Sequence, residues 1–209
     1  FTSNFCGGDY LPKYMIRILL ALSWMLLTFF SYGQNHPVTF QRYSSKDGLS
    51  SNTIYSIYRD SYGFLWLGTE DGLNRFDGRR YNVYRYDATQ ENSLMANHIS
   101  ALCEDKKGRI WIGTNGGGLS YYDREADRIR SYNLTPDGKW LSTAINAVDT
   151  DANGNIWIAS YGALYILDVN NLQKKMDPTY RRIVETFAGK VTSCVFRDRQ
   201  NNMWVSSEN

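Results

Sequence analysis

From residue 38 onward, short apolar runs alternate with polar turns, and this alternation repeats with a long period along the chain. Tryptophans mark the repeat at positions 66, 111, 157 and 204, which are 45, 46 and 47 residues apart. The segments around them align without gaps as 60–69, 105–114, 151–160 and 198–207. Self-similarity at a fixed period of this length is typical of repeat architectures such as solenoids and propellers.

Each aligned segment begins with a turn that leads into the tryptophan-bearing strand. Three of the turns carry Asp first and Gly fourth, a pair that tight turns favour because Asp accepts bonds from the turn's own amides and Gly tolerates positive φ. Asn201 takes the glycine's place in the fourth copy, and Asn is the other residue that adopts positive φ readily. Runs before each turn, apolar on both faces, predict strands covered on both sides at 54–58, 99–103, 145–148 and 191–196.

Two further strands complete each repeat. They are predicted at 73–76, 119–122 and 164–167, and then at 80–86, 128–134 and 181–187. Four short strands in about 46 residues leave no room for a helix and match the unit of a β-propeller blade. We therefore predict an all-β fold, an incomplete β-propeller of four-stranded antiparallel blades, placed at about 49–87, 94–134 and 141–187 with an incomplete blade at 191–209.

Residues 38–43 are predicted to form an outer strand that completes the last blade of a closed ring, whose other strands lie outside this sequence. Open sheet edges are a liability for solubility, so we expect the segment alone to be prone to aggregation.

The first 33 residues have a different character from the repeats. Lys13 and Arg17 precede an uncharged apolar stretch at 18–30, and small residues follow it three positions and one position before Gln34. This order is typical of a secretory signal peptide, which we place at 15–33, with 1–14 as an upstream extension and 34–209 as the partial propeller. A transmembrane helix is the alternative, but it needs about 20 apolar residues.

Composition narrows the function classes. The 209 residues are 43% hydrophobic and 15% aromatic, with 17 glycines, only four prolines and a net charge of +2, which suits an all-β globular chain. Charges of both signs are interspersed, so we expect no nucleic-acid binding by this segment. Three unpaired-looking cysteines and two histidines supply neither a disulfide framework nor a zinc site, and we predict no metal and no cofactor.

The repeat unit from Ile54 to Asp77, preceded by the sequence Gly-Leu-Ser-Ser-Asn at 48–52, closely resembles the two-component-regulator propeller repeat. The resemblance covers about 40–209. It implies the N-terminal periplasmic sensor region of a Bacteroidetes-type hybrid histidine kinase, with further blades, a β-sandwich, a membrane helix, a kinase and an output domain downstream. The departures are Ala159 and Ser160 in place of Gly-Thr, Asn201 in place of Gly, and one inserted residue at Gly116–Gly118.

Candidate chemistry is sparse. Residues 149–156 resemble the opening of a calcium-binding loop, but Ser160 stands where the bidentate Glu belongs, so an ordinary blade turn is favoured. His98 lacks the sequence context of a phospho-acceptor and is interpreted as a loop residue. The loops between the second and third strands should open on the face where propellers bind ligands, and their chemistry differs from blade to blade. We predict Glu70, Asn115 and Tyr161 as ligand-facing; the alternative is that they are solvated loop residues.

Three functional classes stay open. The resemblance favours an exported sensor that binds an oligosaccharide and signals to a kinase in the missing C-terminal remainder of the chain; it allows a homodimer, and membrane contact only through a downstream span. The alternatives are an exported propeller enzyme, such as a polysaccharide lyase or glycosidase, and a structural or adhesive propeller. No catalytic residues are identified, and the segment itself is not expected to be an enzyme.

Overall fold

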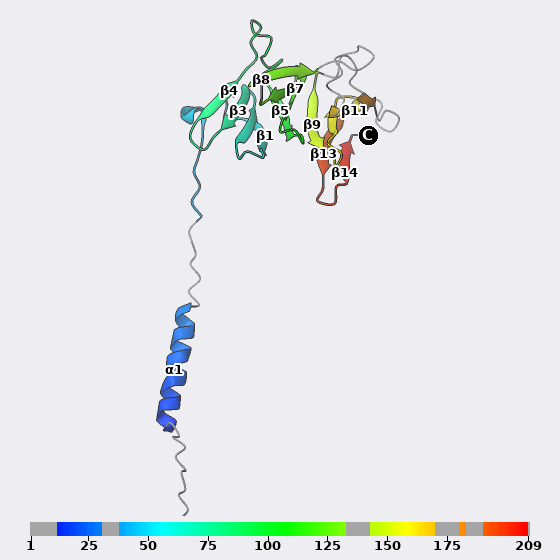
Figure 1. Cartoon of the computed structure of the whole chain (residues 1–209). Helices are drawn as coiled ribbons and strands as arrows, with labels where there is room; N and C mark the ends of the chain where they lie inside the picture. The colour runs from blue at the N-terminus through cyan, green and yellow to red at the C-terminus, as the bar shows by residue number, and fades with distance from the viewer. Residues whose placement is uncertain (1–11, 31–37, 133–142, 170–179, 183–189, 209) are drawn as a thin grey trace, which may run out of the picture. The chain divides into compact units, whose positions relative to one another are not determined.

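The computed structural model describes residues 12–30, 38–132, 143–169, 180–182 and 190–208 (Figure 1). Contacts divide the chain into two units, Phe1–Arg42 and Tyr43–Asn209. In the first unit, helix α1 (Lys13–Phe30) spans most of the predicted signal peptide. None of the helices in these ranges is both long enough and apolar enough to cross a lipid bilayer.

The second unit consists of successive antiparallel sheets, each a meander in which neighbouring strands pair in chain order. A short 3-10 helix, η1 (Ser45–Asp47), precedes them. Blade 1 contains β1 (Ile54–Arg59), β2 (Leu65–Thr69), β3 (Gly72–Phe76) and β4 (Tyr81–Tyr84). Blade 2 contains β5 (Ile99–Glu104), β6 (Ile110–Thr114), β7 (Gly118–Asp123) and β8 (Arg128–Tyr132). Blade 3 contains β9 (Ile145–Thr150), β10 (Ile156–Ser160), β11 (Ala163–Leu167) and β12 (Tyr180–Arg182), and blade 4 contains β13 (Thr192–Arg197) and β14 (Met203–Ser207).

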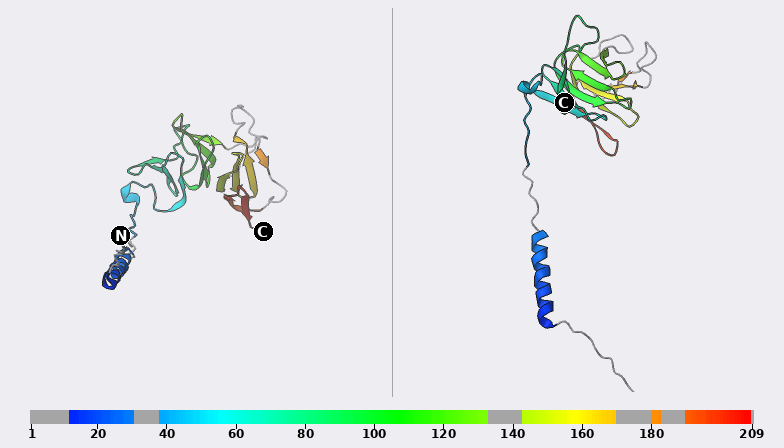
Figure 2. Two further views of the ribbon diagram at one scale, coloured as in Figure 1. Left: turned by 60° about the horizontal axis from the view of Figure 1, so that its bottom comes forward. Right: turned by 60° about the vertical axis from the view of Figure 1, so that its left-hand side comes forward.

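The four-stranded antiparallel blades confirm the predicted fold class. The sheets follow one another along the unit, as the three views show (Figures 1 and 2), and the first strand of each blade contacts the first strand of the next. The last strand of blade 3 was predicted at 181–187; β12 covers its beginning, and 183–187 lie outside the described residues, as do 133–134 and 141–142 of the predicted blade boundaries.

The hydrophobic core lies between the blades. One buried cluster joins Trp66 of blade 1 to Leu102 and Ile112 of blade 2. A second joins Cys103 and Trp111 of blade 2 to Val148 and Ile158 of blade 3. Each blade therefore presents one face to the blade before it and the other to the blade after it.

The described structure differs from a closed ring at its blade edges. Residues 38–43 form no strand in it; the strands predicted to pair with them lie outside this sequence, so this pairing stays a prediction. The first strands of blades 2 and 3 are covered on both sides, but β1 is not: Ile57 is 63% exposed, since no described blade packs on that side.

Close approach between blades explains one departure from the repeat. A Cβ on Gly68 or Gly113 would lie 2.8 or 2.7 Å from Cγ2 of Ile99 or Ile145 in the next blade. Blade 3 has Ala159 at this position. The next blade there offers Thr192 instead of isoleucine, and its hydroxyl accepts from the Ser160 backbone amide at 2.9 Å. The larger residue on one blade is thus matched by a smaller and polar residue on its neighbour.

Candidate ligand-binding face

The turn between the first and second strands is held by the same hydrogen bonds in every blade. We call this set of bonded turns the frame, and the edge of the blades where they lie the frame edge. The indole Nε1 of the repeat tryptophan donates to the carboxylate of the turn aspartate in all four blades, at 2.7 Å for Trp66–Asp60, 2.8 Å for Trp111–Asp105, 3.1 Å for Trp157–Asp151 and 2.9 Å for Trp204–Asp198. The same aspartates accept two backbone amides of their own turn. Asn201 adopts φ +68°, which confirms the positive φ predicted for it.

These hydrogen bonds lower the pKa values of Asp60 and Asp198. Burial raises the pKa of Asp60, but hydrogen bonds from Trp66 and Arg124 outweigh it and leave the pKa lowered. The bonds from Trp204 and Asn202 lower the pKa of Asp198 to about 2. The lowered pKa values mean that Asp60 and Asp198 hold the frame as ionised carboxylates, whereas the sequence analysis expected these aspartates only to form turns.

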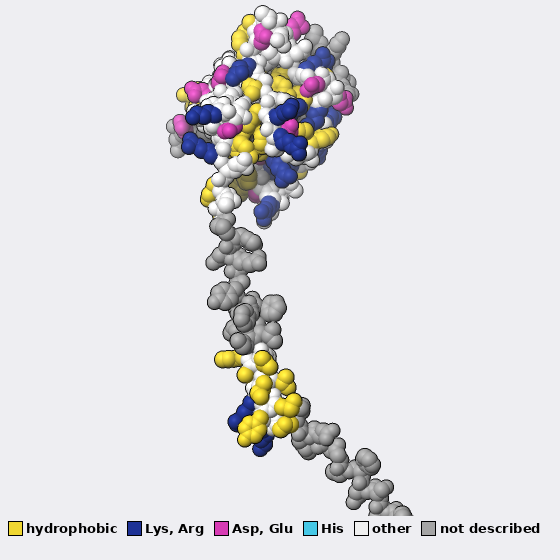
Figure 3. Space-filling view, turned by 90° about the vertical axis from the view of Figure 1, so that its left-hand side faces the viewer, with side chains coloured by type: hydrophobic (Ala, Val, Ile, Leu, Met, Phe, Trp, Pro, Cys, Tyr) yellow, Lys and Arg dark blue, Asp and Glu magenta, His cyan; other side chains and the backbone are white. Residues whose placement is uncertain are grey.

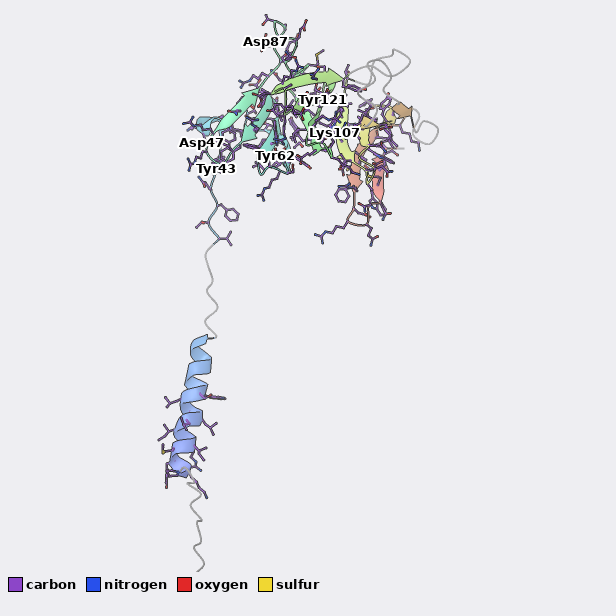
Figure 4. All side chains as sticks on the ribbon, in the orientation of Figure 1. Tyr43, Asp47, Tyr62, Asp87, Lys107 and Tyr121 are labelled. Atoms are coloured by element: carbon purple, nitrogen blue, oxygen red, sulfur yellow. The ribbon has the colours of Figure 1, made fainter. Side chains whose placement is uncertain are left out.

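The loops between second and third strands lie at the opposite edge of the blades. Figure 4 labels Tyr62 and Lys107 on turns of the frame edge, and Asp87 on the β4–β5 connection at the other edge. At that other edge, the backbone N–H groups of Glu70, Asn115 and Tyr161 each donate to a carbonyl just before the first strand of their own blade, at 3.2, 2.9 and 3.4 Å. The three predicted residues therefore occupy equivalent positions, and all three side chains are exposed.

Sequence reasoning missed a fourth member of this set. The Glu208 N–H donates to the Val191 carbonyl at 3.0 Å, and its side chain is exposed, as in the other three blades. The signal was available, because Glu208 follows Ser207 as Glu70 follows Thr69 and Tyr161 follows Ser160. We call Glu70, Asn115, Tyr161 and Glu208 the loop-edge set.

Polar and aromatic groups surround the loop-edge set on blades 1 and 2. The Asp71 carboxylate pairs with Arg85 at 3.0 Å and accepts from the Asn97 amide at 3.3 Å. The ring of His98 stacks on Tyr55, with centroids 4.3 Å apart. His98 lies directly before β5, where the sequence predicted a loop residue.

A concavity of about 560 Å³ opens further out, along β4 and the β4–β5 connection. It is lined by Val83, Tyr84, Arg85, Tyr86, Asp87, Ala88, Gln90, Asn92, Ser93 and Ile129. None of the loop-edge set lines it. Its size is within the range of small-molecule sites, but some of its polar groups bond to one another, as Asp87 does to Gln90 and Ser93.

The calcium-like motif is a turn of the frame. Asp149 accepts the Arg197 amide at 2.7 Å, and Asp151 accepts from Asn155 and Trp157. Within the described ranges, no group of three or more His, Cys, Asp or Glu residues is placed to hold a metal ion. The carboxylates of Asp149 and Asp151, which resemble calcium ligands in the sequence, accept hydrogen bonds from protein N–H groups.

The class of protein follows from this architecture: four-stranded antiparallel meanders in series, with equivalent loops gathered at one edge, define a β-propeller. Residues 48–71, 93–116 and 187–209 match the two-component regulator propeller family, so these stretches are repeats of that family and confirm the resemblance found in the sequence.

Known proteins add context. A 61-residue stretch is 39% identical to histidine kinase P4 of Formosa agariphila, covering 29% of this chain and 4% of that protein. The extracellular domain of a hybrid two-component system from B. thetaiotaomicron is similar over 74% of this chain and 22% of its own, with 26% identity and a TM-score of 0.61. The virginiamycin B lyase of Staphylococcus aureus shares the fold, at 14% identity, a TM-score of 0.56 and coverage of 82% of this chain and 54% of its own. The chain thus covers only a small part of the length of the histidine kinase and of the extracellular domain, 4% and 22%.

Proposed function

We propose that this chain is part of the exported sensor propeller of a hybrid two-component receptor. The propeller binds a ligand outside the cytoplasm, and the bound state biases a histidine kinase elsewhere in the longer protein. The repeats and the similarity to an extracellular domain of such a system support this role. On this proposal, α1 acts in export: Lys13 and Arg17 lie near its start, and its apolar side chains, such as Leu20 and Trp24, are exposed.

One observation carries the ligand-binding part of the proposal. The frame edge repeats the same Asp–Trp bond in every blade, whereas the loop-edge set changes from Glu to Asn to Tyr to Glu at positions fixed by the same backbone bond. A constant frame with varied exposed side chains is what recognition requires, because the frame fixes positions and the variation supplies specificity.

The ligand class that fits this chemistry is an oligosaccharide. Carboxylates and an amide accept and donate hydrogen bonds to hydroxyl groups, and an exposed tyrosine offers a flat apolar surface for the face of a sugar ring. The Asp71–Arg85 pair, which is half exposed, adds further polar groups at the same edge.

The experiment is calorimetric titration of the chain with hexasaccharides from xylan, arabinan, mannan and chitin. Tyr161→Ala should weaken binding of whichever probe binds at least tenfold. Tyr62→Ala is the matched control, because both tyrosines are 69% exposed but Tyr62 lies on the opposite edge. Equal losses for the two variants, or no binding of any probe, would contradict the carbohydrate proposal.

The same titrations address the enzyme alternative. Release of shorter or unsaturated products from a bound hexasaccharide would favour a glycosidase or lyase over a sensor. Binding without turnover supports the sensor, and the lyase in the comparisons shares only the fold with this chain.

A further inference from the structure

The second residue of the first strand differs between blade 1 and the next two blades. It is Ser100 in blade 2 and Asn146 in blade 3. Ser100 Oγ donates to the Ile145 carbonyl, and Asn146 Nδ2 donates to the Thr192 carbonyl at 2.8 Å, so each of them bonds to the blade that follows. Blade 1 has Tyr55 at this position, and the Tyr55 side chain makes no hydrogen bond to the described residues.

Tyr55 instead stacks on the ring of His98 in blade 2. The ring centroids are 4.3 Å apart and the ring planes are inclined by 22°. The stack covers one face of the tyrosine ring, and Tyr55 is still 50% exposed, so the other face is open. A ring that is held in one orientation loses little further freedom when a ligand packs on it.

The exposure of Tyr55 does not come from the uncovered side of blade 1. That side carries Ile57, which corresponds to Leu102, a residue that packs against Trp66 of the preceding blade. Figure 3 looks at the propeller unit from the uncovered side and shows hydrophobic side chains in the centre with Lys and Arg around them. Tyr55 contacts the following blade, as its counterparts in blades 2 and 3 do, and that blade is part of the described structure.

The loop that carries Glu70 joins the two halves of the stack. Its Glu70 N–H donates to the Thr53 carbonyl at 3.2 Å, two residues before the stacked tyrosine. Its Gly72 N–H donates to the carbonyl of Asn97 at 2.8 Å, and Asn97 directly precedes the stacked histidine. The exposed carboxylate of Glu70 and the open tyrosine face therefore belong to one small region at the contact of blades 1 and 2.

We propose that Tyr55, stacked on His98, is a subsite for one sugar ring of the ligand, and that Glu70 makes this subsite select an uncharged sugar over a uronate. An open aromatic face packs on the apolar face of a sugar ring. A carboxylate accepts hydrogen bonds from sugar hydroxyls but repels a second carboxylate. This inference rests on the proposed function and adds two residues that lie outside the loop-edge set.

Calorimetric titration tests the subsite with the neutral hexasaccharides from xylan, arabinan, mannan and chitin and with hexagalacturonate. Tyr55→Ser should weaken binding of the neutral probe about tenfold, whereas Tyr55→Phe keeps the ring face and should bind within about twofold of the unaltered chain. Serine is the residue of blade 2 at this position, so the variant can bond to the following blade as Ser100 does. Tyr55→Asn copies blade 3 in the same way and should lose as much binding as Tyr55→Ser.

Tyr86→Ser is the matched control. Tyr86 is also 50% exposed, but it lies on the β4–β5 connection and lines the outer concavity. Binding of the neutral probe to this variant should be unchanged. An equal loss for Tyr86→Ser and Tyr55→Ser would place the sugar elsewhere and overturn the proposal.

His98 is a positioning residue, because it acts through the tyrosine ring. His98→Ala removes the stack and should weaken binding of the neutral probe about threefold, and His98→Phe, which keeps a stacked ring, should restore it. A role of His98 in the loop alone predicts no such restoration. Circular dichroism spectra that match the unaltered chain establish that each variant is folded.

The remaining outcomes separate this subsite from the proposed function. Binding that is lost in Tyr161→Ala but kept in Tyr55→Ser leaves the carbohydrate ligand in place and overturns the subsite. Hexagalacturonate that binds as tightly as the neutral probe overturns the selection by Glu70. Binding of none of the probes contradicts the carbohydrate ligand and the subsite together.

Discussion

Removing the aspartate of the blade 2 turn should destabilise the chain far more than removing its counterpart in blade 4. In blade 2, Asp105 accepts from Trp111 Nε1 at 2.8 Å and from Arg109 Nε at 2.6 Å, in addition to two turn amides. Trp111 is fully buried, and Arg109 already has one buried nitrogen, Nη2, without a partner. Asp105→Ala therefore leaves a buried indole N–H and a guanidinium without their acceptor.

The size of the effect follows from these contacts. A hydrogen bond to a charged group contributes about 1.5–3 kcal/mol, and breaking a buried ion pair by removing one partner costs about 3–5 kcal/mol. The turn amides regain water, so we expect Asp105→Ala to lower the free energy of unfolding by about 3–5 kcal/mol. That is a large part of the roughly 5–15 kcal/mol of a typical domain.

The assay is urea unfolding followed by circular dichroism, with Asp198→Ala as the matched variant. Asp198 makes the same bond to its tryptophan at 2.9 Å, but Trp204 is exposed, so water can replace the lost acceptor. We expect a much smaller decrease for Asp198→Ala. Equal decreases for the two variants would refute the reasoning, because they would show that burial of the tryptophan does not set the cost.

Three further predictions test the blade contacts and the frame. Gly113→Ala places a Cβ 2.7 Å from Ile145 and should cost about 1–3 kcal/mol in urea unfolding; a neutral effect would show that the blades yield easily. Arg124→Met removes a donor to Asp60 and to the Gly108 carbonyl and should cost about 2–3 kcal/mol, whereas Arg85→Met, in a half-exposed pair, should cost under about 1 kcal/mol. The pKa values of Asp60, Asp151 and Asp198 are lowered in the folded state, so the bonds of these carboxylates stabilise the fold above the unfolded pKa of about 3.9. This contribution is lost as pH falls toward the folded pKa values, about 2 for Asp198. The free energy of unfolding should therefore drop below about pH 4, and Asp198→Asn should make that drop shallower.

The blades were predictable from the sequence because their signals are local. The turn with Asp first and Gly fourth, and the apolar run on either side of it, determine where strands begin and end, so β2, β6, β10 and β14 lie where the tryptophans place them. The Asp–Trp bond was not foreseen, although both residues were noted, because spacing alone does not show that a side chain folds back to its own turn. The exposure of Ile57 was mispredicted for a related reason: a strand's pattern shows which faces can be buried, and the neighbouring blade decides whether they are.

The loop edge also combines features that the local sequence predicts with features that depend on distant residues. The sequence placed Glu70, Asn115 and Tyr161 at equivalent points because they follow the repeat directly, and the backbone bonds of the structure agree. The Tyr55–His98 stack joins residues 43 positions apart in neighbouring blades, and no local pattern marks it. The positions of strands and loops were therefore accessible to sequence reasoning, whereas the side-chain contacts, both the Asp–Trp bond within a blade and the Tyr55–His98 stack between blades, needed coordinates.

The Asp–Trp bond also explains how the repeat tolerates variation at its other edge. Trp204 keeps its bond to Asp198 although no described blade covers it, so the position of the tryptophan is set within its own blade before any neighbour packs on it. In repeat proteins, stability is approximately the sum of such internal contributions and nearest-neighbour contacts. Neither contribution involves the exposed side chains of Glu70, Asn115, Tyr161 or Glu208, whose backbone amides alone are bonded at this edge. Substitution at these positions is therefore nearly free of consequences for the fold, which is the physical condition for a surface whose chemistry can be selected for a ligand.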